Sequence, residues 1–463
     1  MSSNNKELGN ESIIRLLFKY SIPAIIAMMV NALYTIIDRM FIGRIPDVGA
    51  IAMSGVGMTM PIVCIVMGIS MLIGVGSAAS ISIKLGQQKR NIAEKILGNA
   101  FTLSIIASLI ITFLGVIFSE NILATLGAGQ ETLMYAKQFI NIVLIGTIFN
   151  VLGFALNQCI RSDGNPKIAM TTMIIGAVAN IILDPIFIFA FRWGIKGAAY
   201  ATVLSQFISC AWIVKYFLSG KSSLKLKKEN LKLDTGLIKI IFAIGMAPCA
   251  MQIAASMVQV VSNKSLITYG GDLAAGAMAV VSSISMIFLM PIFGMNQGSQ
   301  PIIGYNIGAK NYKRVKKAVL YSVIAATIVV VIAFLLTQLF PGAFIKMFNN
   351  DPKLVSTAIT GLRIYLCMLP IVGFQIICAN YFQASGKAKI AMFLSLLRQV
   401  FFLIPLMVIL PKFLGLTGVW LAGPISDFLS AVVTLGFIIR ELKIINKLEV
   451  ENNQEELIAK EIL

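Results

Sequence analysis

Residues 13–43 read IIRLLFKYSIPAIIAMMVNALYTIIDRMFIG. Between Lys19 and Asp38 this stretch holds no charged residue, and about 20 apolar residues are enough for a helix to cross the hydrocarbon core of a bilayer. Two residues depart from a plain apolar span, because Pro23 removes a backbone hydrogen bond and Asp38 carries a charge. The stretch therefore predicts a transmembrane helix that bends and that contains a candidate functional acid.

The rest of the chain has the same apolar character. Of its 463 residues, 58% are hydrophobic and 13% are charged, with a mean hydropathy of +0.87. Soluble domains have about 25% charged residues, so a soluble enzyme, a nucleic-acid-binding module and a disordered protein are excluded. We expect an all-α polytopic membrane protein whose twelve transmembrane helices span 12–42, 50–80, 94–118, 131–160, 167–190, 195–218, 237–267, 274–303, 314–340, 353–384, 388–411 and 416–444.

The net charge of +18 comes from Lys and Arg residues in the short gaps between apolar runs. Most of the 38 basic residues fall in alternate gaps, which predicts that those gaps and both termini face the cytoplasm. The first ten residues are polar and no small-residue cleavage pattern follows, so we expect no cleavable signal peptide. The expected location is a bacterial inner (cell) membrane, and the expected protein is a monomer that binds no nucleic acid.

The chain contains no His, and its Cys residues form no CxxC pair, which disfavours a metal cluster. We expect no cofactor and no resident metal. The six Cys residues lie inside apolar runs, where thiols most often act as small hydrophobic groups, at Cys64, Cys159, Cys210, Cys249, Cys367 and Cys378.

The two halves of the sequence repeat one another in order. Pro23 and Asp38 correspond to Pro248 and Asn263, and the string Lys-Ile-Ala-Met occurs at 167–170 and again at 389–392. We therefore expect an N-lobe at 1–218, a cytoplasmic linker at 219–235, a C-lobe at 236–444 and a cytoplasmic tail at 445–463. Six helices per lobe make the repeat parallel, a geometry that suits transport by alternating access.

Polar residues inside the apolar runs are costly and are functional candidates by default. Asn31, Tyr34 and Asp38 have the spacing of one helix face, and Asn180 lies one turn before Asp184. Carboxylate, amide and hydroxyl oxygens together can hold Na⁺, or a buried carboxyl can carry a proton. The alternative is that these residues only hold helices together or cap a helix end.

The second half lacks the matching acids. Asn263 replaces Asp38, and Ile404 stands where Asp184 stands in the first half. Arg398 and Asp427 are its intramembrane charges, and they form either a structural salt bridge or part of a cavity. We assign a set of residues to the substrate cavity, at Asn31, Tyr34, Arg398 and Asp427.

Several motifs give the chain a recognisable character. They are Ser21-Ile-Pro-Ala, Asn31-Ala-Leu-Tyr-Thr-Ile-Ile-Asp-Arg-Met-Phe-Ile-Gly43, Gly86-Gln-Gln, Arg161-Ser-Asp-Gly-Asn-Pro166 and Asn180-Ile-Ile-Leu-Asp-Pro185. Together they resemble the multidrug and toxic compound extrusion (MATE) family over about residues 12–444, and within it the DinF-like branch with its MepA-like exporters.

The resemblance implies twelve helices in two lobes and export of bulky organic cations in exchange for Na⁺ or H⁺. It also implies one cation site in the first lobe, with the matching residues Asp38, Asn157, Asn180, Asp184 and Thr202. Tyr34 and the bending Pro23 match the family as well. The NorM-like branch instead has acids in the second lobe, which this sequence lacks.

The sequence thus predicts a secondary active exporter of amphipathic, mostly cationic drug-like compounds that works in contact with membrane lipids. The alternative is a lipid-linked saccharide flippase of the same superfamily, whose anionic cargo needs several Arg or Lys residues in the cavity. A passive channel is disfavoured because no pore loop is repeated. An intramembrane enzyme is disfavoured because no nucleophile and base occur together.

Overall fold

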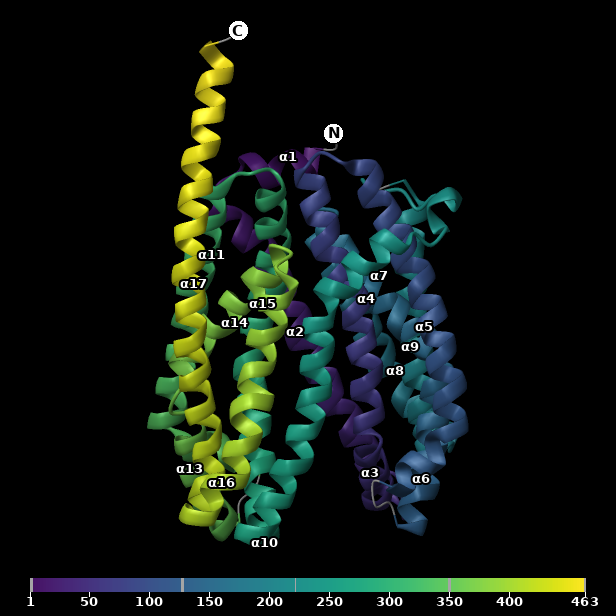
Figure 1. Cartoon of the computed structure of the whole chain (residues 1–463). Coiled ribbons are helices and arrows are strands. Elements are labelled where there is room, and N and C mark those ends of the chain that lie inside the picture. The colour runs from purple at the N-terminus through teal and green to yellow at the C-terminus, as the bar shows by residue number, and fades with distance from the viewer. Residues whose placement is uncertain (1–2, 126–128, 221, 349–350, 462–463) are drawn as a thin grey trace. The chain divides into compact units, whose positions relative to one another are not determined.

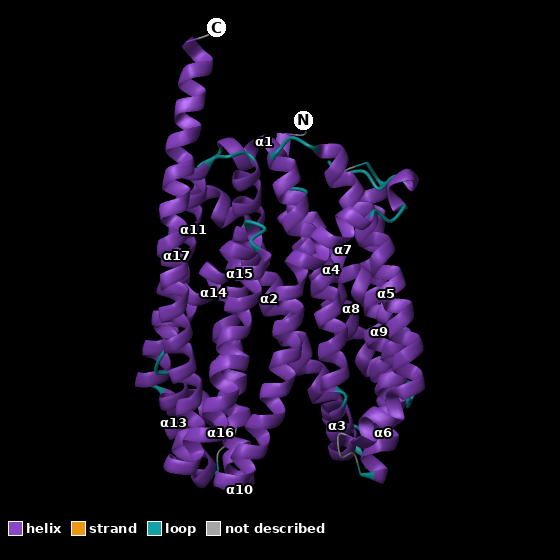
Figure 2. Cartoon of the chain, in the orientation of Figure 1, coloured by secondary structure: helices purple, strands orange, loops and turns teal. Residues whose placement is uncertain are grey.

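The computed structural model describes residues 3–125, 129–220, 222–348 and 351–461. Within these ranges every regular element is a helix, and short loops connect the helices (Figures 1 and 2). A helix satisfies all its backbone hydrogen bonds internally, so it is the element that apolar runs form in a membrane. The predicted all-helical membrane fold is confirmed.

The elements of the first half are α1 (Ser3–Asn10), α2 (Ile13–Gly43), α3 (Gly49–Met58), α4 (Met60–Gly86), α5 (Arg90–Thr125), α6 (Gln130–Ile145), α7 (Thr147–Ser162), α8 (Pro166–Pro185), the π-helix η1 (Ile186–Ala190), α9 (Gly194–Leu218) and the 3₁₀ turn η2 (Lys228–Leu231). Those of the second half are α10 (Thr235–Gly308), α11 (Tyr312–Leu339), α12 (Pro341–Lys346), α13 (Pro352–Tyr365), α14 (Leu369–Ala384), α15 (Ala388–Leu396), the π-helix η3 (Leu397–Leu403), α16 (Ile404–Leu414) and α17 (Leu416–Glu461).

Eight of the described helices are long and apolar enough to cross a membrane, or up to ten if each of two bent pairs forms one span. The bent pairs are α6 with α7, at 53°, and α13 with α14, at 51°. Helix α10 enters this count once, although its backbone turns at Gly271, where φ is 65° and ψ is −168°. The twelve-span arrangement therefore stays a prediction.

Some predicted spans are interrupted in the structure. The span 50–80 divides at Thr59 into α3 and α4, and the span 131–160 divides at Gly146 into α6 and α7. Hydropathy does not register such breaks, because every residue around them is apolar or small. Helix α17, in contrast, continues without a break to Glu461, inside the expected tail, and its end projects beyond the neighbouring helices of its half (Figure 1).

The fold contains two compact units. The first comprises chiefly Ile26–Leu85 and Lys89–Ile253, and the second comprises Lys6–Ile25, Gly86–Gln88 and the described residues from Ala254 onward. Two long helices are divided between the units. Helix α2 changes unit after Ile25, and α10 changes unit after Ile253. The start of each long helix therefore packs with the unit formed mainly by the other half of the sequence.

Glycines permit this close packing within each unit. In the first unit a Cβ on Gly245 of α10 would meet the Leu72 backbone of α4. In the second unit a Cβ on Gly298 would lie 2.6 Å from the Cα atom of Ser21 in α2. Any larger residue at these two positions would push the helices apart.

Each unit has its own hydrophobic core. In the first unit, Ile42 at the end of α2 packs in a cluster with Ile188 of η1 and Ile195 of α9. In the second unit, Trp420 of α17 packs among α10, α11, α13 and α14. The first cluster matters for function, because it brings the last turns of α2 against the junction of α8 and η1.

Candidate functional site

Asp184 is the most buried acid of the first unit's apolar helices, with 0% of its surface exposed. It lies one residue before Pro185, where α8 ends and the π-helix η1 begins. The Nδ2 group of Asn180, one turn earlier, donates a hydrogen bond of 3.3 Å to Asp184 Oδ1. The spacing of these two residues predicted this pairing, and π-helical turns often occur at functional sites.

Asp38 reaches the same place from α2. Its carboxyl group lies within hydrogen-bonding reach of the Asp184 carboxyl group, and the Tyr34 side chain is close enough to interact electrostatically with both. Among the described residues no Lys or Arg forms an ion pair with either acid, and the one basic group that interacts electrostatically with Asp38 is the exposed Arg39 beside it. Two acids side by side repel each other when both are ionised, so they need a proton or a cation between them.

Three oxygen atoms at this site are buried and accept no hydrogen bond. They are Asp38 Oδ1, Asn180 Oδ1 and Asp184 Oδ2. A buried acceptor without a donor is unfavourable by about 1–3 kcal/mol, and by more when it is charged. Carboxylate and amide oxygens are the ligands that hard cations such as Na⁺ prefer, and a proton shared by the two acids would also satisfy them. These three oxygen atoms could therefore bind either Na⁺ or H⁺.

The other predicted ligands already have partners. Asn157 in α7 is buried, donates to the Ala169 carbonyl oxygen at 2.9 Å and accepts from Arg161 at 3.1 Å. Thr202 in α9 donates its hydroxyl group to the Ala198 carbonyl oxygen. Within the described ranges no hydrogen bond joins Asn157 or Thr202 to either acid, and their part in a cation site stays a prediction.

The packing of α8 on α9 shows where Thr202 lies. Ser209 Oγ donates to the Thr172 carbonyl oxygen, and a Cβ on Gly176 would contact Ser209. In this antiparallel register Thr202 is near the level of Asn180. Gln206, one turn further along α9, has a buried Oε1 atom without a donor. Sequence reasoning missed Gln206, although its spacing of four from Thr202 was a usable signal.

The remaining predicted cavity residues belong to different units. Asn31 is half-buried in α2, and its carbonyl oxygen accepts from the Thr35 hydroxyl group. In the second unit Arg398 of η3 forms an ion pair with Asp427 of α17, and Tyr365 lies close to both. The salt bridge that the sequence allowed is therefore present.

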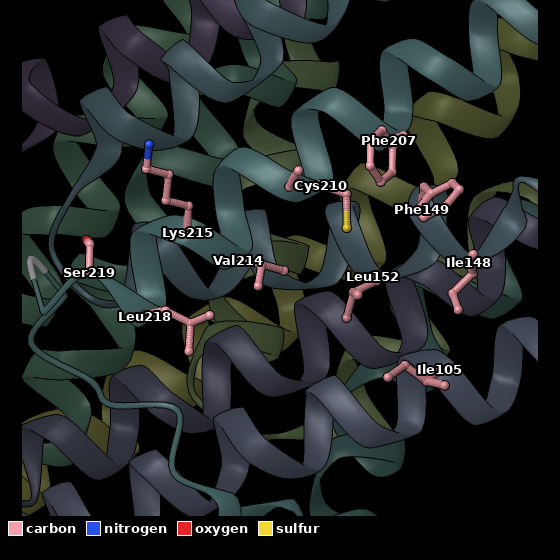
Figure 3. Close-up of a pocket in the computed structure, with 11 residues that line it drawn as sticks. Ile105, Ile148, Phe149, Leu152, Phe207, Cys210, Val214, Lys215, Leu218 and Ser219 are labelled. Carbon is pink, nitrogen blue, oxygen red and sulfur yellow. The ribbon is translucent and has the colours of Figure 1, made fainter.

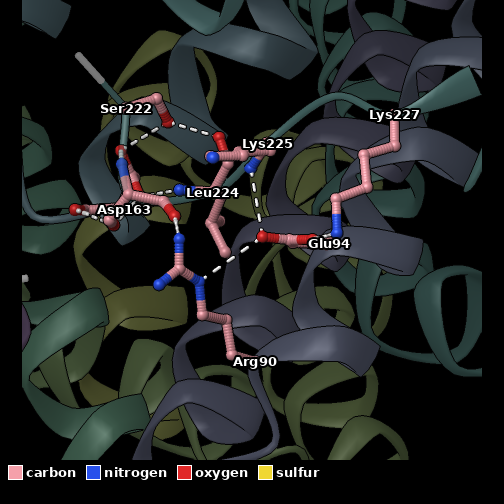
Figure 4. A network of polar contacts seen from close by, with 8 residues as sticks. Arg90, Glu94, Asp163, Ser222, Leu224, Lys225 and Lys227 are labelled. Carbon is pink, nitrogen blue, oxygen red and sulfur yellow. Dashed lines mark hydrogen bonds and ion pairs between the residues drawn. The ribbon is translucent and has the colours of Figure 1, made fainter. Parts of the chain in front are cut away.

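A second polar network, which the sequence did not predict, surrounds Asp163 in the loop after α7 (Figure 4). Asp163 Oδ2 accepts from the hydroxyl groups of Tyr216 and Ser222, each at 2.8 Å, and Oδ1 accepts from the Ser223 hydroxyl group and from the Leu224 N–H group. Burial raises the pKa of the Asp163 carboxyl above its usual value, and these donors, which lower the pKa, offset only part of that rise. Asp163 thus fastens the start of the linker to the first unit.

Glu94 of α5 holds the next part of the linker (Figure 4). Glu94 is 4% exposed, and its carboxylate pairs with Lys227 Nζ at 3.0 Å and accepts from the Lys225 N–H group at 3.4 Å. Arg90, one turn earlier, contacts Glu94 at 3.4 Å and donates to the Ser223 carbonyl oxygen. Residues 222–227 of the Lys-rich linker are therefore held against the first unit.

Comparison with known proteins agrees with this architecture. The family model described as MatE matches residues 23–186 and 248–409. The chain is 27% identical over 440 residues to the multidrug export protein MepA of Staphylococcus haemolyticus (strain JCSC1435), covering 95% of this chain and 96% of that protein. It is also 27% identical over 423 residues to MepA of Staphylococcus aureus (strain MRSA252), covering 91% and 93%.

The fold also matches a solved structure described as the outward-facing conformation of a multidrug resistance MATE family transporter of the MOP superfamily. The TM-score is 0.90 at 23% identity, and the match covers 96% of this chain and 99% of the other. At this identity the likeness concerns the fold.

Proposed function

Since this chain belongs to the MatE family of membrane transporters, we propose that it is a secondary active multidrug exporter driven by Na⁺ or H⁺. It is a multi-pass membrane transporter and not an enzyme. The relatives that match it over more than nine-tenths of their length are named multidrug export proteins. Drug-like compounds, mostly amphipathic cations, are the proposed cargo.

The observation that carries the proposal is the group of buried acceptor oxygens on Asp38, Asn180 and Asp184. This site needs a positive charge, because the two acids cannot both be ionised at low cost without one. An entering Na⁺ or H⁺ can supply that charge. Each charge gains about 2.3 kcal/mol per 100 mV of membrane potential, in addition to the gain from its concentration gradient.

We propose that the two units alternate access to the cargo, with the first unit carrying the coupling site. Support comes from the way α2 and α10 are each divided between the units. A helix divided in this way bends when the units move. Binding of the coupling ion beside α2 would then favour one state of that helix, as ligands favour the conformation that they bind better.

A flippase for anionic lipid-linked saccharides fits less well. Its cargo requires unpaired basic groups, but the intramembrane Arg398 forms an ion pair with Asp427.

Both termini and the linker are proposed to face the cytoplasm, on the basis of the charge distribution.

The experiment that tests the proposal is export of an organic cation by cells that produce the Asp184→Asn variant. We expect normal production and loss of ion-coupled export, because the amide cannot take up a proton or pair with Na⁺ through a charge. The matched control is Asp272→Asn, a change at an exposed acid of α10. Wild-type export by Asp184→Asn would show that this carboxylate only holds helices together.

A further inference from the structure

Helix α9 has a surface stripe that transport of a cationic drug does not explain. Its residues recur at intervals of three or four, which is the spacing of one helix face. The stripe lines two neighbouring pockets, and its members are Lys196, Tyr200, Val203, Leu204, Phe207, Cys210, Ala211, Val214, Lys215 and Leu218. The stripe is therefore apolar along its length, with one Lys near each end.

The first pocket has a volume of about 690 Å³ and lies between α9, α7 and α5 (Figure 3). Ile105 of α5 and Leu152 of α7 form its far wall, and Lys215 lies at the end next to the linker. The second pocket, of about 640 Å³, extends toward the other end of α9 and is lined there by Trp193 and Lys196. Both volumes lie in the range of about 300–1,000 Å³ that is typical of small-molecule sites.

The two pockets meet at a pair of aromatic rings. Phe149 and Phe207 line both pockets, and their ring centroids are 5.0 Å apart in an edge-to-face arrangement. Phe207 lies near the midpoint of the stripe between Lys196 and Lys215. At a rise of about 1.5 Å per residue the two Lys residues are about 28 Å apart along α9, which matches a hydrocarbon core about 30 Å thick.

Several side chains that border these pockets are exposed, whereas Leu152 and Cys210 are buried. Phe207 is 46% exposed and Leu218 is 66% exposed, so the stripe faces outward from the first unit's core. Lys196 and Lys215 are exposed as well, and neither pairs with an acid in the part of the chain that the structure describes. A cationic drug would be repelled by these groups, whereas a phosphate would be attracted.

We propose that these two pockets bind the acyl chains of anionic phospholipids, one lipid from each leaflet, with the phosphates at Lys215 and Lys196. The chains of the two lipids would end at the Phe149–Phe207 pair, at the level of the bilayer midplane. A basic residue at the mouth of a groove between transmembrane helices favours anionic headgroups. This binding site is separate from the Asp38–Asp184 pair and does not depend on the coupling ion.

Native mass spectrometry of the purified protein with phosphatidylglycerol and phosphatidylcholine of identical acyl chains tests the proposal. We expect the wild type to retain up to two phosphatidylglycerol molecules in preference to phosphatidylcholine. Lys215→Gln should weaken the binding of one of them about fivefold, the effect of one basic residue at an anionic membrane surface, and should leave the molecule at Lys196 bound. Lys215→Arg should retain both molecules. The matched control is Lys167→Gln, at an exposed residue of α8 that lines neither pocket.

A second variant tests the cavity itself. Ala211→Phe fills the first pocket from its exposed side and should reduce retention of phosphatidylglycerol without any change in charge. Equal retention of the two lipids by the wild type, equal losses in Lys215→Gln and Lys167→Gln, or full retention by Ala211→Phe would each overturn the proposal.

Native tryptophan fluorescence gives a second readout. Of the three Trp residues, Trp193 lines the second pocket, Trp212 of α9 is 44% exposed and Trp420 is buried in the second unit. In a Trp212→Phe background, brominated phosphatidylglycerol should therefore quench the fluorescence more than brominated phosphatidylcholine does, and adding Trp193→Phe should remove that difference. Equal quenching by the two lipids, or a difference that persists in Trp193→Phe, would contradict anionic lipid at the second pocket.

Discussion

Asp184 and Asp38 are 146 positions apart in sequence, yet their carboxyl groups lie side by side in the first unit. The local part of this arrangement was predictable, since the four-residue spacing of Asn180 and Asp184 fixes their hydrogen bond. The contact with Asp38 was implied only by the family resemblance. It depends on the packing of Ile42 against η1 and α9, which no local pattern encodes.

The family resemblance implied that Asn157 belongs to the cation site, and this stays a prediction. The structure shows its amide bonded to Arg161 and to the Ala169 backbone. Asp163 was overlooked because a loop acid normally faces water, and its burial follows from the folding back of the linker. The partners of Asn157 and the burial of Asp163 both depend on tertiary contacts, which the local sequence does not show.

The first residue-scale prediction concerns which half supplies the coupling site. Asp38→Asn should abolish the Na⁺ or pH dependence of export, because the amide cannot exchange a charge. Asn263→Ala, at the corresponding position of the second half, should keep that dependence and alter only drug affinity. Initial export rates measured against external pH and Na⁺ check this. The reverse result would place the coupling site in the second unit.

The second residue-scale prediction concerns stability. Asp163→Asn should destabilise the protein by about 3 kcal/mol, because the new amide nitrogen faces hydrogen-bond donors and leaves buried donors without an acceptor, at a cost of about 1–3 kcal/mol each. We expect the midpoint of thermal unfolding in detergent to fall by several degrees. Glu229→Gln, at an exposed acid of the same linker, should leave it unchanged. An unaltered midpoint in Asp163→Asn would mean that the linker is held mainly by Glu94.

At the scale of the elements, hydropathy predicted where apolar helices lie but not how they bend or break. The breaks at Thr59 and Gly146 occur within apolar surroundings, where neither charge nor hydropathy changes. The division of α2 between the units was equally invisible, since Pro23 indicated only a bend. In the structure Pro23 lies just before Ile25, the last residue of α2 that belongs to the second unit.

Pro23→Ala should therefore slow export. The substitution restores a backbone hydrogen bond and removes a ring clash, which together favour a straight helix by about 3 kcal/mol. The bent state of α2 then becomes less populated, and the cycle slows at the step that requires it. Pro424→Ala, inside α17 and within one unit, is the matched control. Equal export rates for wild type and Pro23→Ala would show that bending of α2 is not part of transport.

At the scale of the whole molecule, the internal repeat and the charge distribution predicted two lobes and a cytoplasmic linker. The structure contains two compact units, with the linker fastened to the first by Asp163 and Glu94. Because the linker is held in this way, Ser222 is only 6% exposed, although its neighbours in the sequence are polar. A label for topology must therefore be placed elsewhere in the linker.

Lys228 is such a position, because it is exposed in η2. In a variant without native cysteines, Lys228→Cys should resist a membrane-impermeant thiol reagent in intact cells and react in everted vesicles. Asp272→Cys, at an exposed site predicted to lie outside the cell, should show the opposite pattern. Labelling of Lys228→Cys from outside would reverse the proposed topology.

Export by ion exchange through the first unit is tested most directly in proteoliposomes that hold the purified protein and an organic cation. Na⁺ and pH gradients are imposed separately, with the membrane potential clamped. We predict that an inward gradient of the coupling ion drives the cation outward against its own gradient in the wild type. The Asp38→Asn and Asp184→Asn variants should not support this movement. Equal movement with and without either gradient, or gradient-driven export by both variants, would contradict this account.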